Sequence, residues 1–264
     1  MKILLKIRYD GSGYCGFQTQ PNGITVQEVL TKAFTHLMGF PCCITGCSRT
    51  DSGVHALGFC AALEPADPAV LATKWCKIPT EKIHRAVNMH LPEDIAVVAA
   101  AEVEDDFHPR YSVVSKAYEY HIHNAPYRDP FLRQRVCHDP VCIDDTALER
   151  MRQTAQLFLG THDFKGFMSS GSSVEDCTRT VIHSAVWREG DRIVFRVEAD
   201  GFLYNMVRIM AGSLLDVAHG RKTTEDIREA IQAGIRTSAG FTASPDGLYL
   251  CDVRYGRDIQ WMCK

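Results

Sequence analysis

The sequence predicts an α+β protein whose two halves carry the same order of secondary-structure elements. In some short segments apolar and polar residues alternate, as expected for half-buried strands. In others apolar residues recur every three to four positions, as expected for amphipathic helices. In each half these segments follow one another in the order β-α-β-β-α-β, which predicts sheets covered by helices.

The first half begins with a strand over residues 2–9, where apolar side chains alternate with lysine and arginine. A helix is expected over residues 25–38, because its apolar residues form one stripe. Thr25 and Glu28 are spaced as a capping box, and Gly39 is a stop signal. The remaining elements of this half are two strands, a helix and a strand, expected over residues 42–47, 54–63, 80–89 and 94–103.

The second half repeats this order and adds a short amphipathic helix. Its strands are expected over residues 117–123, 179–188, 192–199 and 248–255, and its helices over residues 144–159, 203–219 and 224–233. Each half then matches the split β-α-β arrangement of a ferredoxin-like fold, with mixed or antiparallel sheets. We expect two pseudo-equivalent domains, residues 1–104 and 105–264, with a central catalytic cleft between them.

The composition indicates a globular protein with a full core. The chain has 264 residues, of which 45% are hydrophobic and 23% charged. Charged residues interrupt the N-terminal segment and no long apolar run follows, so we expect a cytoplasmic protein with no membrane partner. The 11 cysteines are scattered along the chain and are expected to be reduced thiols.

Neither a metal nor another cofactor is predicted. Cys42, Cys43 and Cys47 do not form a paired C-x-x-C arrangement, and no histidine pair follows at zinc-finger spacing. The net charge of −3 argues against a protein that coats nucleic acid non-specifically, although it is compatible with a basic RNA-binding cleft. The cations available for such a cleft are Arg49, Arg110, Lys116, Arg128, Arg133, Arg135, Lys165, Arg179 and Arg208.

The segment from Ser48 to Ala56 places an acid beside an arginine in a tight turn between two predicted strands. Such a turn can present the carboxylate of Asp51 to a ligand. In the alternative interpretation, Asp51 bonds its own backbone in an Asx turn and Arg49 is solvated.

Arg208 is the only charged residue within the apolar stretch 204–215, which is typical of a buried helix. Its guanidinium keeps its proton, so it requires a carboxylate or a ligand phosphate as partner. Asp51 is a candidate partner. The alternatives are a core ion pair or a side chain that extends to the surface.

Tyr118 lies on the predicted strand after Lys116, on the same face as Tyr120 and Ile122. Its ring could stack on an unpaired nucleobase. The alternative is core packing with a hydrogen-bonded hydroxyl.

Taken together, these motifs resemble those of bacterial tRNA pseudouridine synthases of the TruA type, over nearly the whole chain. The matching segments include Tyr9-Asp10-Gly11, Gly16-Phe17-Gln18, Arg49-Thr50-Asp51, Gly53-Val54-His55-Ala56, Asp106-Phe107-His108, Tyr118-Glu119-Tyr120, Met206-Val207-Arg208 and Gly247-Leu248-Tyr249-Leu250. The chain departs from the common pattern at Phe17, where tryptophan is common, and at Ser48 and Ser52, where glycine and alanine are frequent.

The resemblance implies isomerisation of uridine to pseudouridine at positions 38 to 40 of the tRNA anticodon stem-loop, without a cofactor. Asp51 would attack the sugar or remove a sugar proton, Arg208 would keep it ionised, and Tyr118 would pack on the base. Arg49 would fill the space of the flipped nucleotide. The residues expected to bind RNA are Arg49, Arg110, Lys116, Tyr118 and Arg179. The resemblance also implies a homodimer in which one tRNA touches both subunits.

Two other function classes compete with this interpretation. A non-catalytic RNA-binding module of the same fold would also expose aromatic residues on a sheet, but it leaves Asp51 and Arg208 without a role. A thiol or metal enzyme would use Cys47 or Cys60 with His55, but the sequence offers no group to activate either cysteine.

Overall fold

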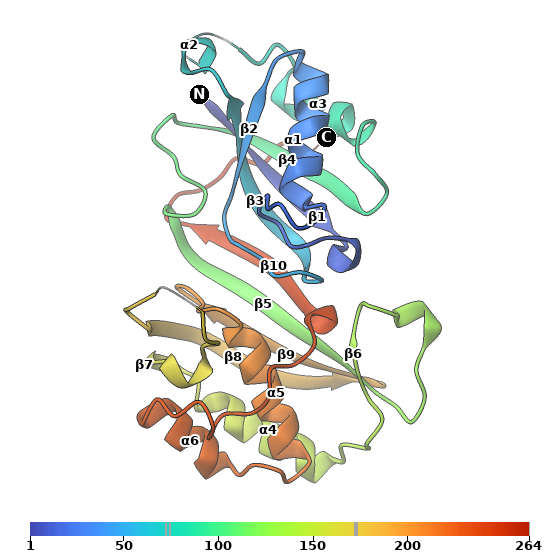
Figure 1. Cartoon of the computed structure of the whole chain (residues 1–264), viewed down its shortest axis with the longest axis vertical. Coiled ribbons are helices and arrows are strands. Elements are labelled where there is room, and N and C mark those ends of the chain that lie inside the picture. Colours follow the sequence, from blue (N-terminus) through green and yellow to red (C-terminus); the bar gives the residue numbers. More distant parts are fainter. Residues whose placement is uncertain (72, 74, 172–173, 264) are drawn as a thin grey trace. The chain divides into compact units, whose positions relative to one another are not determined.

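The computed structural model describes residues 1–71, 73, 75–171 and 174–263. The chain forms two compact units (Figure 1). Unit 1 comprises Met1–Val114 and Leu250–Lys264, and unit 2 comprises Ser115–Tyr249.

Unit 1 contains the β-α-β-β-α-β half expected at the N-terminus. Strand β1 (Lys2–Tyr9) pairs antiparallel with both β3 (His55–Pro65) and β4 (Ile95–Val103). Strand β2 (Cys42–Gly46) pairs with the C-terminal part of β3, and β10 (Leu248–Tyr255) follows β3 in the strand order. The order β4-β1-β3-β2 is that of a split β-α-β fold, so the predicted fold of this half is confirmed.

Helices α1 (Val26–Met38) and α3 (Thr80–Asn88) pack against each other and against the strands of unit 1 (Figure 1). The start of α1 is fixed by the Thr25 side chain, which accepts from the Glu28 amide, and its end by Gly39 in the left-handed conformation. The Glu28 carboxylate itself pairs with Lys32 at 2.6 Å. A single-turn helix, α2 (Pro68–Leu71), was not predicted.

The sheet of unit 2 has the order β5-β9-β8-β7. Its strands are antiparallel and comprise β5 (Val113–Asn124), β7 (Gly160–Asp163), β8 (Thr178–Glu189) and β9 (Arg192–Ala199). A short parallel strand, β6 (Cys137–Asp139), pairs with β5. Neither β6 nor β7 was predicted, because segments of three or four mostly polar residues show no alternation.

Helix α4 (Asp145–Gln156) packs on β8 and on α5 (Met206–Ala218), and α6 (Thr224–Gln232) contacts α4 (Figure 1). The predicted helices over 144–159 and 203–219 were too long. Asp144 is a cap outside α4, and α5 cannot extend back through Asn205, whose φ of 61° is left-handed.

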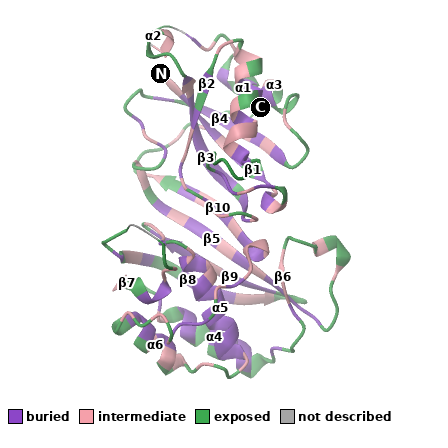
Figure 2. Ribbon diagram, in the orientation of Figure 1, coloured by how far each residue is buried: buried purple, intermediate pink, exposed green. Residues whose placement is uncertain are grey.

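Buried residues lie mainly on the strands and helices of each unit, and loops carry most of the exposed residues (Figure 2). Every residue of α5 except Arg208 is buried, as the apolar pattern predicted. Arg208 itself is half-buried. The segment before β6 is largely exposed.

The two units divide the chain differently from the predicted domains 1–104 and 105–264, because both ends of the second range belong to unit 1. Tyr255 stacks edge-on against Phe107 at 5.0 Å, and its hydroxyl donates to the Pro109 carbonyl. Arg257 pairs with Glu104 at 2.7 Å. These contacts hold the C-terminal strand and residues 104–109 in one compact body.

Within the described ranges, no helix combines the length and the apolar character that crossing a membrane requires.

Candidate active site and RNA-binding residues

The turn that carries Asp51 connects β2 to β3 and is held by a second loop of unit 1. The Phe17 amide donates to the Thr50 carbonyl at 3.3 Å, and the Gly53 amide donates to the Tyr14 carbonyl at 3.3 Å. The hydroxyls of Tyr9 and Thr50 bond each other at 2.8 Å in a buried position. These contacts fix the backbone on both sides of Asp51, whose side chain is half-buried.

Two glycines allow the second loop to approach this turn closely. A Cβ atom on Gly11 would lie 2.0 Å from the Val54 carbonyl oxygen, and one on Gly16 would lie 2.5 Å from the Thr50 carbonyl oxygen. Gly16 also has a φ of 82°. The Gly11 amide donates to Nδ1 of the buried His55 at 3.1 Å, so Gly11 also binds the segment that follows the turn.

The loop is anchored at its other end by Tyr14. Its hydroxyl donates to the Asp94 carboxylate at 2.6 Å. Burial, followed by this hydrogen bond to a carboxylate, raises the pKa of Tyr14 well above its usual value. The phenol therefore keeps its proton and serves as a permanent donor.

A pocket of about 200 Å³ beside the turn brings together two predicted RNA-binding residues, Arg49 and Arg110. Tyr111 is 78% exposed, and its ring lies 4.2 Å from that of His108. The Arg110 guanidinium lies 6.0 Å from the Tyr111 ring. Cations beside exposed rings suit a single-stranded nucleic acid, whose phosphates and unstacked bases they bind.

In unit 2, Tyr118 lies on β5 opposite Val197 of β9. Its side chain is buried, and its ring meets Phe202 edge-on at 5.0 Å. Lys116 lies two residues earlier, opposite Ala199 at the end of β9. Both residues therefore adjoin the segment 200–205, which leads into α5.

Arg179 reaches the same segment from β8. A Cβ atom on Gly201 would lie 3.1 Å from Nε of Arg179, so the arginine side chain covers this glycine. One terminal nitrogen of the guanidinium donates to the Asp176 and Thr178 carbonyls, at 3.0 and 2.5 Å. These contacts orient the guanidinium within its own loop.

Arg208 lies in the first turn of α5, directly after this segment. Its Nε donates to the Ala243 carbonyl at 2.7 Å, and a terminal nitrogen donates to the Asn205 side-chain oxygen at 2.8 Å. Asn205 in turn donates to the Ser169 hydroxyl at 3.0 Å. These two hydrogen bonds orient the guanidinium at the start of α5.

The predicted site residues thus form two groups, each within one unit. Arg49 and Arg110 share the pocket of unit 1 beside the Asp51 turn. Lys116, Tyr118, Arg179 and Arg208 surround residues 200–205 of unit 2. The sequence analysis did not identify Tyr111 as a pocket residue, and its only signal was its position beside Arg110.

No cluster of three or more histidine, cysteine, aspartate or glutamate side chains suited to a metal ion occurs in the part of the chain that the structure describes.

Comparisons with known proteins place this geometry in a family. The chain is 41% identical over 253 residues to tRNA pseudouridine synthase A of Thermoanaerobacter sp. (strain X514), covering 96% of this chain and 99% of that protein. It is 43% identical to tRNA pseudouridine synthase A of Caldicellulosiruptor saccharolyticus, with the same coverage. A chain of the crystal structure of a Cbf5-Nop10-Gar1 complex aligns over 94% of this chain and 48% of its own length, with a TM-score of 0.38 and 16% identity, too low to support an argument.

The family model described as tRNA pseudouridine synthase matches residues 6–112 and 154–256. These ranges include the Asp51 turn, the pocket with Arg49 and Arg110, and the segment that carries Arg208. The chain therefore belongs to the tRNA pseudouridine synthase family.

Proposed function

We propose that this protein isomerises uridine to pseudouridine in tRNA, in the anticodon stem-loop at positions 38 to 40. The observation that supports the proposal is the match to the family model. The matched residues include Asp51 and the turn that its neighbours' backbone hydrogen bonds hold in place. In this isomerisation the uracil leaves the ribose at N1, rotates and rejoins through C5. A carboxylate that attacks the sugar or removes a sugar proton serves this chemistry, and we assign that role to Asp51.

Tyr118 and Arg208 complete the proposed catalytic set. Tyr118 is held by Phe202 and would pack on the uracil, with its hydroxyl carrying or relaying a proton. Arg208 is oriented by Ala243 and Asn205 and would supply positive charge to the reacting carboxylate. A cation near a carboxylate favours its ionised form. The pairing of Arg208 with Asp51 stays a prediction from the sequence.

Four cations are proposed to hold the RNA. Arg49 and Arg110 line the pocket beside the Asp51 turn, where Arg49 would fill the space left by the flipped nucleotide. Lys116 and Arg179 lie beside residues 200–205 of unit 2 and would contact phosphates. We further propose a cytoplasmic homodimer in which one tRNA touches both subunits.

The direct test incubates the purified protein with unmodified tRNA transcripts and maps pseudouridine site by site. We expect new pseudouridine at positions 38 to 40 only, and the same yield after exhaustive dialysis against a chelator, with magnesium restored for tRNA folding. Tight tRNA binding without pseudouridine in any transcript would instead support the non-catalytic RNA-binding module. Activity restored only by zinc would contradict the cofactor-free mechanism.

A further inference from the structure

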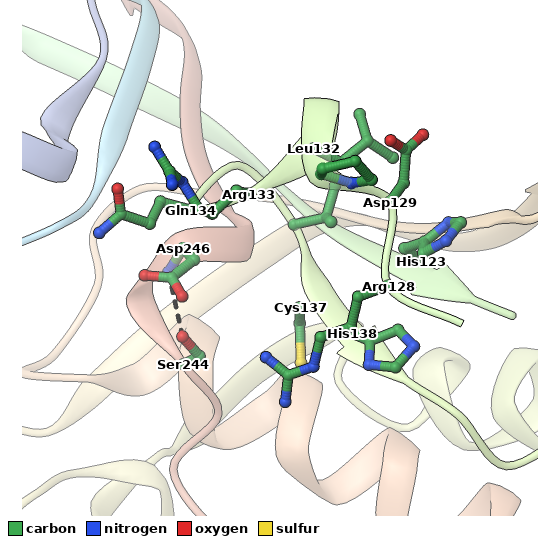
Figure 3. Close-up of a pocket in the computed structure, with 12 residues that line it drawn as sticks. His123, Arg128, Asp129, Leu132, Arg133, Gln134, Cys137, His138, Ser244 and Asp246 are labelled. Atoms are coloured by element: carbon green, nitrogen blue, oxygen red, sulfur yellow. Dashed lines mark hydrogen bonds between the residues drawn. The ribbon is translucent and has the colours of Figure 1, made fainter. Parts of the chain in front are cut away.

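A second, larger pocket lies wholly within unit 2, between the loop before β6 and the segment before β10 (Figure 3). Its volume is about 490 Å³, within the range of roughly 300–1,000 Å³ that is typical of small-molecule sites. It is lined by His123, Arg128, Asp129, Pro130, Leu132, Arg133, Gln134, Val136, Cys137, His138, Ser244 and Asp246. Arg128 and Arg133 are among the cations available for a basic cleft, but no residue given a catalytic or RNA-binding role under the proposed function lines this pocket.

The pocket contains a buried polar atom that lacks a partner. His123 is only 5% exposed, and its Nε2 makes no hydrogen bond within the described residues. Leaving such an atom unsatisfied destabilises the folded protein, so native structures rarely retain one without a reason. A ligand in the pocket would supply the missing partner.

Two arginines of the pocket are also available to a ligand. Within the ranges that the structure describes, the guanidinium groups of Arg128 and Arg133 have no hydrogen-bond or ion-pair partner. Figure 3 shows Arg128 extending toward His138 and Cys137, whereas Arg133 lies with Gln134 and Asp246 on another side. A guanidinium presents up to five donors in a planar fork that fits a phosphate.

The other lining groups differ in chemistry from the two arginines. Asp129 and Asp246 offer carboxylate acceptors, which bind sugar hydroxyls well, and Leu132 and Pro130 offer an apolar wall. A simple anion uses only the cations of such a site. A ribonucleotide uses all of it: a phosphate for the arginines, ribose hydroxyls for the carboxylates, and a base for the apolar wall and for His123.

Residues 244–246, which form one wall of the pocket, directly follow Ala243, whose carbonyl accepts a hydrogen bond from Arg208. The Ser244 carbonyl accepts from the Tyr120 hydroxyl at 2.8 Å, and the preceding residue, Ala243, accepts from Arg208. Two rings on the adjoining loop are exposed: Tyr127 by 61% and Phe131 by 85%. Exposed rings beside the pocket suit the neighbouring bases of a strand, which a free nucleotide lacks.

From these observations we propose that this pocket binds one ribonucleotide of an RNA strand, with its phosphate at Arg128 and its base edge at Nε2 of His123. The inference rests on the proposed function, because it takes the strand to be the tRNA substrate. It adds a recognition subsite to that function.

The test compares tRNA affinity with the binding of three small probes: adenosine 5′-monophosphate, its 2′-deoxy counterpart and inorganic phosphate. The probes carry adenine because a uridine nucleotide could also enter the proposed catalytic site, which acts on uridine. The variants are R128Q, which changes an exposed side chain, and H123F, which keeps a ring but removes the unsatisfied atom. R228Q on α6 is the matched control, since Arg228 pairs only with Glu225 among the described residues.

We expect R128Q and H123F each to weaken tRNA binding about tenfold, as for the loss of one phosphate or base contact, and R228Q to bind like the wild type. The ribonucleotide should bind the wild type more tightly than the deoxyribonucleotide or phosphate, and both pocket variants should lose that binding. H123F should melt at or above the wild-type temperature, because it removes an unsatisfied polar atom.

Wild-type tRNA affinity in folded R128Q and H123F would overturn the proposal. Loss of mononucleotide binding with unchanged tRNA affinity would also overturn it, and would identify a site for a free nucleotide. Equal binding of the three probes would contradict the ribonucleotide assignment. These binding measurements do not require turnover, so a failure of the proposed isomerase activity would be seen separately in the pseudouridine assay.

Discussion

Asp51 is a single carboxylate on a turn whose neighbours on both sides are fixed by backbone hydrogen bonds. The variant D51N keeps the size of the side chain and removes the charge that the chemistry requires. We expect turnover to fall at least about a thousandfold while tRNA affinity stays within a few-fold of the wild type. Single-turnover pseudouridine formation and tRNA binding should be measured on one preparation.

The matched control is D258N, because Asp258 is an exposed aspartate of unit 1 that bonds Gln260. It should retain full turnover. If D51N converts uridine within tenfold of the wild-type rate, Asp51 is not the catalytic carboxylate.

Tyr118 combines a packed ring with a hydroxyl, and Y118F separates the two. The ring would still meet Phe202, so the fold and tRNA binding should survive. The isomerisation should slow by about 10²–10⁴-fold, the range for a lost proton-transfer group. Y118L should lose more, because it also removes the aromatic face. Wild-type single-turnover rates in both variants would mean that Tyr118 serves only the core.

At the level of single residues, the sequence identifies candidate side chains but not the contacts that surround them. Arg49 and Arg110 are 61 residues apart in the sequence, yet they line one pocket, and nothing in the sequence predicted that they would lie together. The role of Thr50 depends on a buried contact with Tyr9, and that of Gly11 on a contact with His55. Such long-range contacts leave no periodic signal, so only the folded chain reveals them.

The loop over residues 10–17 acts as one element that supports the Asp51 turn, and its glycines offer a direct test. In G11A the new Cβ atom would lie 2.0 Å from a backbone oxygen that cannot move independently. We expect a loss of roughly 1–3 kcal/mol in the free energy of unfolding, as for overpacking of a filled site. Turnover should fall by more than tenfold, because the displaced turn carries Asp51.

Gly13 in the same loop provides the control, because a Cβ atom there would meet nothing within 4 Å. G13A should keep both stability and turnover. Thermal melting and single-turnover rates should be measured for G11A and G13A to test whether the close approach at Gly11 supports the Asp51 turn. Equal behaviour of G11A and G13A would show that the turn does not depend on this close approach.

The paired strands β5 and β9 carry a charged network that predicts a pH effect on stability. Hydrogen bonds from His121 at 2.9 Å and from Arg196 at 2.7 Å outweigh the effect of burial and lower the pKa of Glu119 to about 2. Because the folded pKa is below that of the unfolded chain, the stabilisation is complete above about pH 4.5. It is lost as the pH falls toward 2.

The variant E119Q keeps an oxygen acceptor but cannot titrate. We expect it to reduce the acid-range slope of the unfolding free energy, by at most about 3 kcal/mol between pH 4.5 and 2. E149Q on α4 is the control, since Glu149 forms a more exposed ion pair that contributes little. Denaturant titrations at several pH values give the slopes. An unchanged slope in E119Q would mean that the network does not stabilise the fold.

Elements with a complete periodic pattern were predictable, and short ones were not. Helix α1 has an apolar stripe, a capping threonine and a terminal glycine, so its bounds followed from the sequence. Strand β6 has three residues and exists because it pairs with β5, a cause that lies outside its own sequence. The left-handed Asn205 shortened α5 for a similar reason, since its conformation depends on the loop around it.

For the whole molecule, net charge is a poor guide to RNA binding. The chain carries 29 lysines and arginines against 32 acidic residues, yet Arg49 and Arg110 share a pocket with exposed aromatic surface. Association with a phosphate backbone depends on the cations that touch it, because each contact releases condensed counterions. A slightly acidic protein can therefore bind RNA in a salt-dependent way.

This reasoning predicts how salt acts on the wild type and its variants. The logarithm of the tRNA binding constant should fall linearly with the logarithm of salt concentration, with a slope of about −0.7 to −0.9 per phosphate contact. R49Q and R110Q should each reduce the magnitude of the slope by about that amount, and their affinities should approach the wild-type value as salt rises. R85Q, which changes an exposed arginine on α3, should leave the slope unchanged. If R49Q and R110Q lowered affinity equally at every salt concentration, neither arginine would bind a phosphate, and their loss would act through the shape of the pocket.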